Sequence, residues 1–252
     1  MKFCLGTAQF GYPYGLDKKY YVNINSKFKK IIEWNRKKKF FEFIDTAYSY
    51  GDSENIIGKN IKKNDNFKII TKISFDKKQY DFNHLEYNLF KSLEKLKINK
   101  IYGILIHDKS MFSRDRVKVT IDFLNYIKKN KIAKKIGISV YEKSELEKNL
   151  KLFDFNLIQL PTNILNQSFI ENNYLKNISK KYDIFIRSIF LQGLLLENYN
   201  KINKYFNKYE RELTNYYNFL NNNNLSPLEA CLGFFYSLNL KINLVFGVNE
   251  LN

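Results

Sequence analysis

Short apolar runs of the kind that form β-strands alternate with longer segments whose apolar residues recur every three or four positions. That longer repeat predicts amphipathic helices, as in residues 81–96, where four leucines share one face. The predicted strands are residues 2–7, 40–46, 68–74, 101–107, 135–139, 157–160, 184–190 and 242–246. The predicted helices are residues 26–38, 55–63, 81–96, 117–129, 143–152, 169–181, 202–220 and 227–238. We expect Ser53 to cap the helix 55–63, and Ser226 followed by Pro227 to begin the last helix.

Eight strands that alternate with helices predict a parallel sheet, because parallel neighbours must be joined by crossover connections. A chain of 252 residues with eight such units is typical of a (β/α)8 barrel, the TIM-barrel fold. We predict one such domain over residues 1–252. An open doubly wound sheet is the alternative, but no G-x-G-x-x-G motif follows the first predicted strand.

The end of the chain bears on this barrel. The sequence stops six residues after the last predicted strand, so we expect the barrel to lack its eighth outer helix. Apolar surface beside the first and last strands should then lie open. The pattern therefore predicts low stability or self-association through the uncovered side.

Charge and composition narrow the function classes. The formal net charge is +17, yet only five of the 42 basic residues are arginine, the side chain best suited to reading bases and gripping phosphates. A lysine-rich nucleic-acid binder is therefore a weaker alternative. No apolar run is long enough to span a membrane. The two cysteines, Cys4 and Cys231, lie far apart, which favours a reducing cytoplasm and argues against a disulfide framework or a zinc site.

Active sites of β/α barrels lie at the carboxyl ends of the strands. Polar residues gather at those ends in this sequence, and the strand assignment directs all of them toward one mouth. They are Asp45, Tyr50, Lys72, His107, Ser139, Gln159, Asn163, Arg187 and Ser188. Taken alone, each has a structural explanation, such as a half-buried tyrosine or a satisfied core histidine. Their convergence on one site favours catalysis.

One stretch carries a family resemblance. Residues 44–58, reading IDTAYSYGDSENIIG, closely resemble the signature of the aldo-keto reductases. The segments LGTAQFG, ITKIS, ILIHD, GIS and RSIFLQG follow in that family's order, so the resemblance covers nearly the whole chain. It implies a barrel enzyme in which a nicotinamide cofactor gives hydride to a carbonyl carbon and a tyrosine gives the oxygen a proton.

The resemblance also assigns the catalytic residues. Tyr50 matches the proton donor, and Lys72 matches the lysine that makes the family's tyrosine more acidic. Asp45 matches the carboxylate that pairs with this lysine, and His107 matches the imidazole that orients the substrate carbonyl. Positioned acid catalysis of this kind typically contributes about 10²–10⁴ in rate.

The cofactor-binding residues follow from the same resemblance. They are Ser139 and Gln159 for the carboxamide, Arg187 for the nicotinamide ring, Ser188, Gln192 and Gly193 near the pyrophosphate, and Gly247 at the start of the loop that holds the adenosine phosphate. Two positions depart from the family pattern. Val140 stands where an asparagine is common, and Arg187 stands where many members stack a tyrosine on the ring. The resemblance favours NADPH, with NADH as the alternative, and it implies no metal.

Three functions stay open from the sequence. The first is a carbonyl reductase for an aldehyde, ketone or sugar-like substrate. The second is a barrel impaired in catalysis by a missing C-terminal segment. The third is the nucleic-acid binder. Residues 11–25 and the stretch after Gly193 are expected to shape the substrate pocket.

Overall fold

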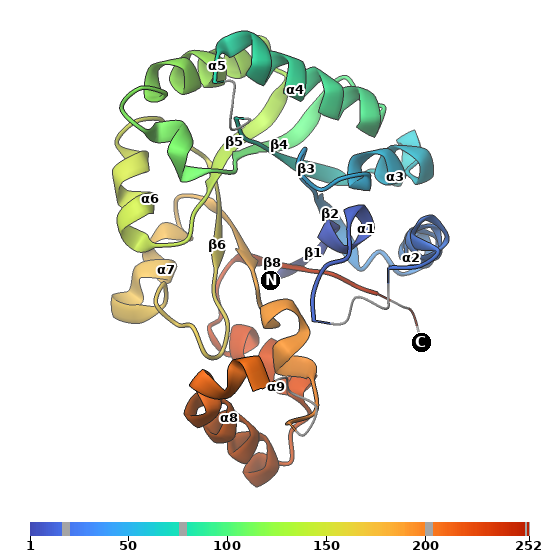
Figure 1. Cartoon of the computed structure of the whole chain (residues 1–252), viewed down its shortest axis with the longest axis vertical. Coiled ribbons are helices and arrows are strands. Elements are labelled where there is room, and N and C mark those ends of the chain that lie inside the picture. The colour runs from blue at the N-terminus through green and yellow to red at the C-terminus, as the bar shows by residue number, and fades with distance from the viewer. Residues whose placement is uncertain (17–20, 76–79, 200–203, 250, 252) are drawn as a thin grey trace.

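Eight parallel strands form a closed barrel in the order β1 to β8, with helices around it (Figure 1). The computed structural model describes residues 1–16, 21–75, 80–199, 204–249 and 251. The strands are β1 (Lys2–Gly6), β2 (Phe41–Asp45), β3 (Lys68–Ile73), β4 (Ile101–Ile106), β5 (Ala133–Ser139), β6 (Leu157–Pro161), β7 (Asp183–Arg187) and β8 (Ile242–Phe246). β8 pairs with β1 and closes the sheet, which confirms the predicted barrel and excludes the open doubly wound alternative.

Except for the short first helix, which was not predicted, helices follow the strands as the periodicity predicts. They are α1 (Ala8–Gly11), α2 (Ile24–Lys38), α3 (Ser53–Asn60), α4 (Phe82–Leu96), α5 (Val117–Lys129), α6 (Lys143–Leu150), α7 (Tyr174–Ile178), α8 (Glu210–Asn223) and α9 (Pro227–Ser237). α9 begins as predicted, because Ser226 and Glu229 form a reciprocal capping box and Pro227 occupies the first turn. α8 and α9 stand together beyond the ring of helices, at the bottom of Figure 1.

Side chains rather than a channel fill the barrel. Seven inward-facing residues form a packed cluster, namely Cys4, Phe43, Ile70, Leu105, Leu157, Phe185 and Val245. A second and larger apolar cluster packs the outer faces of the strands against the helices. The closed interior leaves the carboxyl ends of the strands as the place where polar side chains can meet.

Several predicted boundaries were wrong for local reasons. Ser53 does not cap α3 but is its first residue, and its hydroxyl donates to the Thr7 carbonyl oxygen instead. The predicted helix 169–181 shortens to α7, since Asn172 and Asn173 adopt positive φ values of 55° and 56°. The strand predicted to reach residue 190 ends at Arg187, because the next residue, Ser188, has a φ of +61°.

The last long helical segment also differs from its prediction. Positions 202 and 203 of the predicted helix 202–220 lie outside the described residues. The rest forms a 3₁₀ segment, Lys204–Tyr209, followed by α8, which runs through most of the predicted polar link 221–224. Asn224 then ends the helix with a left-handed φ of 55°.

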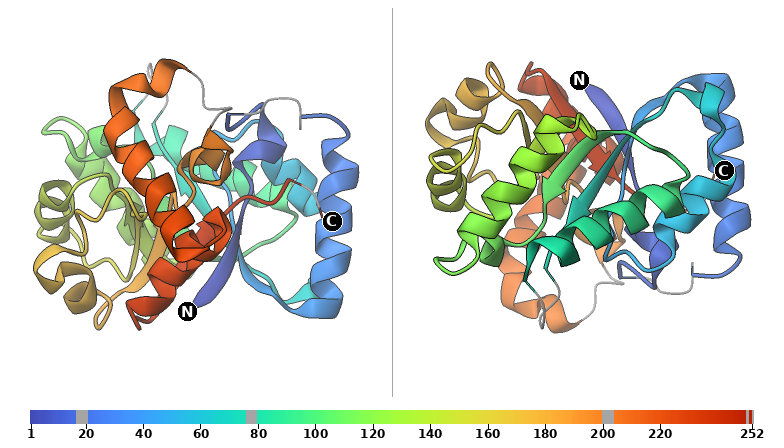
Figure 2. Two further views of the ribbon diagram at one scale, coloured as in Figure 1. Left: turned by 90° about the horizontal axis from the view of Figure 1, so that it is seen from below. Right: turned by 90° about the horizontal axis from the view of Figure 1, so that it is seen from above.

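The outer face of β1 and β8 is covered by aromatic side chains. Phe3 stacks on Phe40 with ring centroids 4.6 Å apart, and the Phe246 ring lies 5.7 Å from Phe3 and 5.6 Å from Phe41. After β8 the described residues form no helix. In the left view of Figure 2, β1 and the chain after β8 pass between α9 and α2 without a helix across them.

Candidate functional site

A cavity of about 550 Å³ opens at the carboxyl ends of the strands. Its walls include Asp45, Tyr50, His107, Gln159 and Arg187, from five different parts of the barrel. Four more residues predicted for the site also line it, namely Ser188, Gln192, Gly193 and Gly247. Lys72 and Ser139 lie just beneath the wall, 1% and 3% exposed respectively. The structure thus brings the predicted residues to one place, with Asn163 buried beside it.

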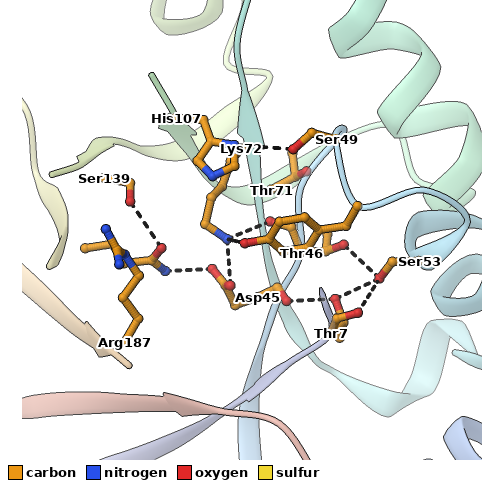
Figure 3. Close-up of polar contacts among 12 residues, drawn as sticks. Thr7, Asp45, Thr46, Ser49, Ser53, Thr71, Lys72, His107, Ser139 and Arg187 are labelled. Carbon is orange, nitrogen blue, oxygen red and sulfur yellow. Dashed lines mark hydrogen bonds and ion pairs between the residues drawn. The ribbon is translucent and has the colours of Figure 1, made fainter. Parts of the chain in front are cut away.

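Lys72 is the centre of the buried polar group (Figure 3). Its ammonium lies 2.6 Å from a carboxylate oxygen of Asp45, 2.9 Å from the Thr46 carbonyl oxygen and 3.4 Å from the Tyr50 hydroxyl. Burial lowers the pKa of Lys72, but the neighbouring Asp45 carboxylate and Tyr50 hydroxyl outweigh burial and raise that pKa overall. The lysine is therefore held as a cation in direct contact with a phenol.

A second chain of contacts fixes the carboxylate. The Gln159 amide donates to the other oxygen of Asp45 at 2.7 Å, and the Ser139 hydroxyl donates to the Gln159 carbonyl oxygen at 3.4 Å. Asp45 therefore has a partner on each oxygen and does not carry an uncompensated charge. β2, β3, β5 and β6 are joined through this network at the floor of the cavity.

His107 is held as a neutral imidazole. Burial, together with the charges of Lys72 and Arg187, lowers the pKa of His107 to about 3. Its Nδ1 lies 3.4 Å from the Ser49 hydroxyl, and its ring packs edge-on against Tyr50 with centroids 6.0 Å apart. Near neutral pH this ring can donate or accept a hydrogen bond but cannot supply a proton as a cation.

The turn that carries Tyr50 is anchored on both sides. The Ser53 hydroxyl lies 2.8 Å from the Thr7 hydroxyl and 3.2 Å from the Thr46 hydroxyl, so it ties α3 to the ends of β1 and β2. The backbone of Gly11 passes so close that an added Cβ would lie 1.7 Å from the Tyr50 carbonyl oxygen. Only glycine permits this approach, and the tyrosine is positioned by packed backbone.

Arg187 reaches from β7 across to the end of β5. Its guanidinium lies 4.2 Å from the centroid of the Tyr141 ring and donates to the Val140 carbonyl oxygen at 3.1 Å. A further contact, to the Ser188 hydroxyl, is 3.5 Å long. Val140 and Arg187, the two residues that depart from the family pattern, are therefore in direct contact with each other.

The loop after β7 has an unusual backbone. Leu191, Gln192 and Gly193 follow one another with positive φ values of 45°, 59° and 99°. An added Cβ at Gly193 would meet nothing within 4 Å, so this loop borders open space. On the other side of the cavity, Gly247 lies against the Gln9 side chain, whose amide donates to the Val248 carbonyl oxygen at 3.4 Å.

Sequence reasoning anticipated one part of the cavity wall and missed another. Tyr12 and Tyr14 lie in the segment 11–25, which was expected to shape the pocket, although positions 17–20 are outside the described part. Tyr141 was missed because its exposed ring acquires a role only through Arg187, which is distant in sequence. The position of Tyr141 directly after Ser139 and Val140 was the available signal.

The described part of the chain shows neither a metal-ion centre nor a membrane-spanning helix. No group of three or more His, Cys, Asp or Glu side chains in the described part is arranged to hold a metal ion. None of the described helices combines the length and apolar character needed to cross a bilayer.

The fold is a closed β/α barrel that carries a polar network at the carboxyl ends of its strands. Residues 2–252 match the model of the aldo/keto reductase family. The chain therefore belongs to the aldo-keto reductase family, and this membership implies chemistry with a nicotinamide cofactor. A comparison with curated protein sequences finds no significant match.

Several solved structures share this barrel fold. A putative aldo-keto reductase from Pseudomonas aeruginosa is 15% identical, with a TM-score of 0.70 over 98% of this chain and 84% of the other. A glycerol dehydrogenase from Gluconobacter oxydans is 18% identical, with a TM-score of 0.71 over 98% and 82% of the two chains. An aldo/keto reductase from Brucella melitensis is 19% identical, with a TM-score of 0.67 over 98% and 84%. At these identities the likeness establishes the fold.

Proposed function

We propose that this chain is an NADPH-dependent carbonyl reductase that acts on an aldehyde, ketone or sugar-like carbonyl, with Tyr50 as the proton donor. One observation carries the proposal. The buried Lys72 ammonium contacts Asp45 at 2.6 Å on one side and the Tyr50 hydroxyl at 3.4 Å on the other. An ammonium beside a phenol stabilises the phenolate that remains after the proton has left.

The residues divide the work as follows. The substrate carbonyl oxygen lies between the Tyr50 hydroxyl and His107. We assign the ring proton of His107 to Nε2, with Nδ1 accepting from the Ser49 hydroxyl 3.4 Å away, so that Nε2 donates to the carbonyl oxygen and orients it. As the carbonyl carbon accepts hydride, its oxygen takes the proton from Tyr50, and the alcohol forms. Water then returns a proton to the phenolate, while Lys72 and Asp45 keep their charges.

The residues proposed for the cofactor fit a nicotinamide nucleotide. The Ser139 hydroxyl and the Gln159 amide supply the donor and acceptor pattern that a carboxamide needs, next to the proton donor. Ser188, Gln192 and Gly193 lie on a loop whose left-handed backbone and open space suit an anionic group such as a pyrophosphate. Gly247, directly after β8, lines the same cavity. When bound, the reduced cofactor supplies the hydride.

The decisive experiment compares two tyrosine variants. Wild-type protein should oxidise NADPH in the presence of a generic aldehyde, and Tyr50→Phe should reduce kcat by at least about 10² while the fluorescence titration with NADPH is unchanged. Tyr236→Phe is the matched control, because Tyr236 is 78% exposed on α9, away from the cavity. Turnover in Tyr50→Phe equal to that of wild type would remove Tyr50 from the mechanism. An inactive wild type would favour the impaired barrel instead.

Cofactor preference has its own measurement. NADPH carries one more phosphate than NADH, and the formal net charge of +17 favours the more anionic cofactor by long-range attraction. Titration of the wild-type protein with both cofactors at two salt concentrations should give the lower Kd for NADPH. Equal Kd values for the two cofactors at low salt would contradict a preference of the protein for NADPH.

We also propose a cytoplasmic setting and self-association through the aromatic face of β1 and β8. Cys4 and Cys231 are buried free thiols, which suit a reducing compartment. Phe40, which stacks on Phe3 of β1 and precedes β2, is 41% exposed within this aromatic cluster, and a second copy would shield it. Sedimentation of the wild type and of Phe40→Ser tests this. A monomer at high concentration for the wild type would exclude it.

A further inference from the structure

The cavity carries one uncompensated charge. Among the described residues of its wall, Asp45 is the only acid and Arg187 the only lysine or arginine. The Asp45 carboxylate is engaged by Lys72 at 2.6 Å, and His107 is neutral because its pKa is lowered to about 3. What remains is the positive charge of Arg187.

The guanidinium also has unused hydrogen-bonding capacity. An arginine side chain has five N–H donors, and among the described residues Arg187 has two hydrogen-bond partners, the Val140 carbonyl oxygen at 3.1 Å and the Ser188 hydroxyl at 3.5 Å. No carboxylate in the described part of the chain forms an ion pair with it. A cation with spare donors at the wall of a cavity is suited to bind an anion.

Arg187 is held in place before any ligand arrives. The centroid of the Tyr141 ring lies 4.2 Å from the guanidinium carbon, and the hydrogen bond to the Val140 carbonyl oxygen fixes one guanidinium nitrogen. This support lowers the entropy cost of forming further bonds from the same group. The charge also acts on His107, where it is one of the causes of the lowered pKa, so it lies within electrostatic reach of the reacting carbonyl.

We infer that the substrate of this chain is a small carbonyl compound that carries a carboxylate or phosphate group, and that the N–H edge of Arg187 binds this group. The inference deepens the proposed function and rests on it. It is compatible with the place of Arg187 in the cofactor set, because stacking on a nicotinamide ring uses the face of the guanidinium and anion binding uses its edge.

The experiment compares matched substrates. 4-Carboxybenzaldehyde is paired with 4-(hydroxymethyl)benzaldehyde, and glyceraldehyde 3-phosphate with glyceraldehyde, so that the two arms distinguish a carboxylate from a phosphate. Hydrogen bonds to charged groups contribute about 1.5–3 kcal/mol, which corresponds to roughly 10- to 100-fold in kcat/KM. Wild-type protein should prefer the anion by this factor in at least one pair.

Two arginine variants then locate the preference. Arg187→Gln should bring the anionic-to-neutral ratio of kcat/KM to about 1, and Arg187→Lys should leave an intermediate ratio because it keeps the charge but loses the fork. Arg211→Gln makes the same change on the exposed surface of α8 and should keep the wild-type ratio. A change in cofactor binding affects both substrates of a pair equally and therefore cancels in the anionic-to-neutral ratio of kcat/KM. Melting curves identify any variant that does not fold.

The outcomes separate the two proposals. A wild-type ratio near 1, or a preference that survives in Arg187→Gln, overturns the inference while the neutral aldehyde still tests carbonyl reduction. A weaker NADPH affinity in Arg187→Gln with an unchanged ratio would assign the charge to the cofactor alone. If no aldehyde is reduced, calorimetry with 4-(hydroxymethyl)benzoate and 1,4-benzenedimethanol measures the same preference without turnover, again in wild type and Arg187→Gln.

Discussion

The two halves of the cavity are built differently. On the side of β2 to β4, Asp45 and Lys72 are fixed by a buried ion pair, and His107 follows directly at the end of β4. On the side of β7 and β8, the wall consists of loop backbone with positive φ values and of Arg187, whose guanidinium packs against the exposed ring of Tyr141. The first half leaves little freedom for substitution, since every charge in it has a partner. The second half can change its side chains and so can set what binds.

The largest effect is expected from breaking the first half at its centre. Lys72→Met leaves Asp45 buried with its amide partner but without the cation, and losing one member of a buried ion pair typically costs about 3–5 kcal/mol. We expect a lower free energy of unfolding by this amount in urea denaturation, together with a loss of kcat of at least about 10² in the NADPH assay.

A matched lysine gives the control for that experiment. Lys91 pairs with Glu94 at 2.8 Å on the exposed surface of α4, and Lys91→Met should leave the free energy of unfolding close to that of the wild type. If the two variants are equally stable, the buried network does not hold the first half together.

A second test uses pH instead of mutation. The pKa of His107 is about 3 in the folded chain against an ordinary 6.5, so the unfolded chain binds a proton at this site first as the pH falls. Stability from this group is complete above pH 6.5 and is lost progressively toward pH 3. We expect wild type to lose roughly 1.5 kcal/mol more than His107→Gln between about pH 6.5 and pH 5, measured by urea denaturation. Parallel pH profiles for the two proteins would contradict the buried neutral imidazole.

The same division explains what the sequence could predict. Asp45, Lys72 and His107 stand at strand ends, and strand positions follow from apolar periodicity, so their meeting could be predicted. The contact between Arg187 and Tyr141 could not, because it depends on the direction of two side chains from strands that are not neighbours. The predicted helix bounds were wrong where asparagines such as Asn172 adopt left-handed conformations, because apolar periodicity carries no signal for them.

The smallest effect is expected in the second half, at Gly193. Its φ of 99° disfavours any side chain, whereas an added Cβ would meet nothing within 4 Å, so Gly193→Ala isolates backbone strain from steric clash. We expect a loss of about 1 kcal/mol in the free energy of unfolding and a weaker affinity for NADPH in the fluorescence titration.

Gly233 provides the opposite case for comparison. It lies within α9, and an added Cβ there also meets nothing within 4 Å, so Gly233→Ala should stabilise the chain by about 0.5–1 kcal/mol and leave NADPH affinity unchanged. The two substitutions are chemically identical and both enter open space, so opposite signs can only come from the backbone. If Gly193→Ala binds NADPH as wild type does, the loop after β7 does not approach the cofactor, and the adaptable half of the cavity would be confined to Arg187 and the tyrosines around it.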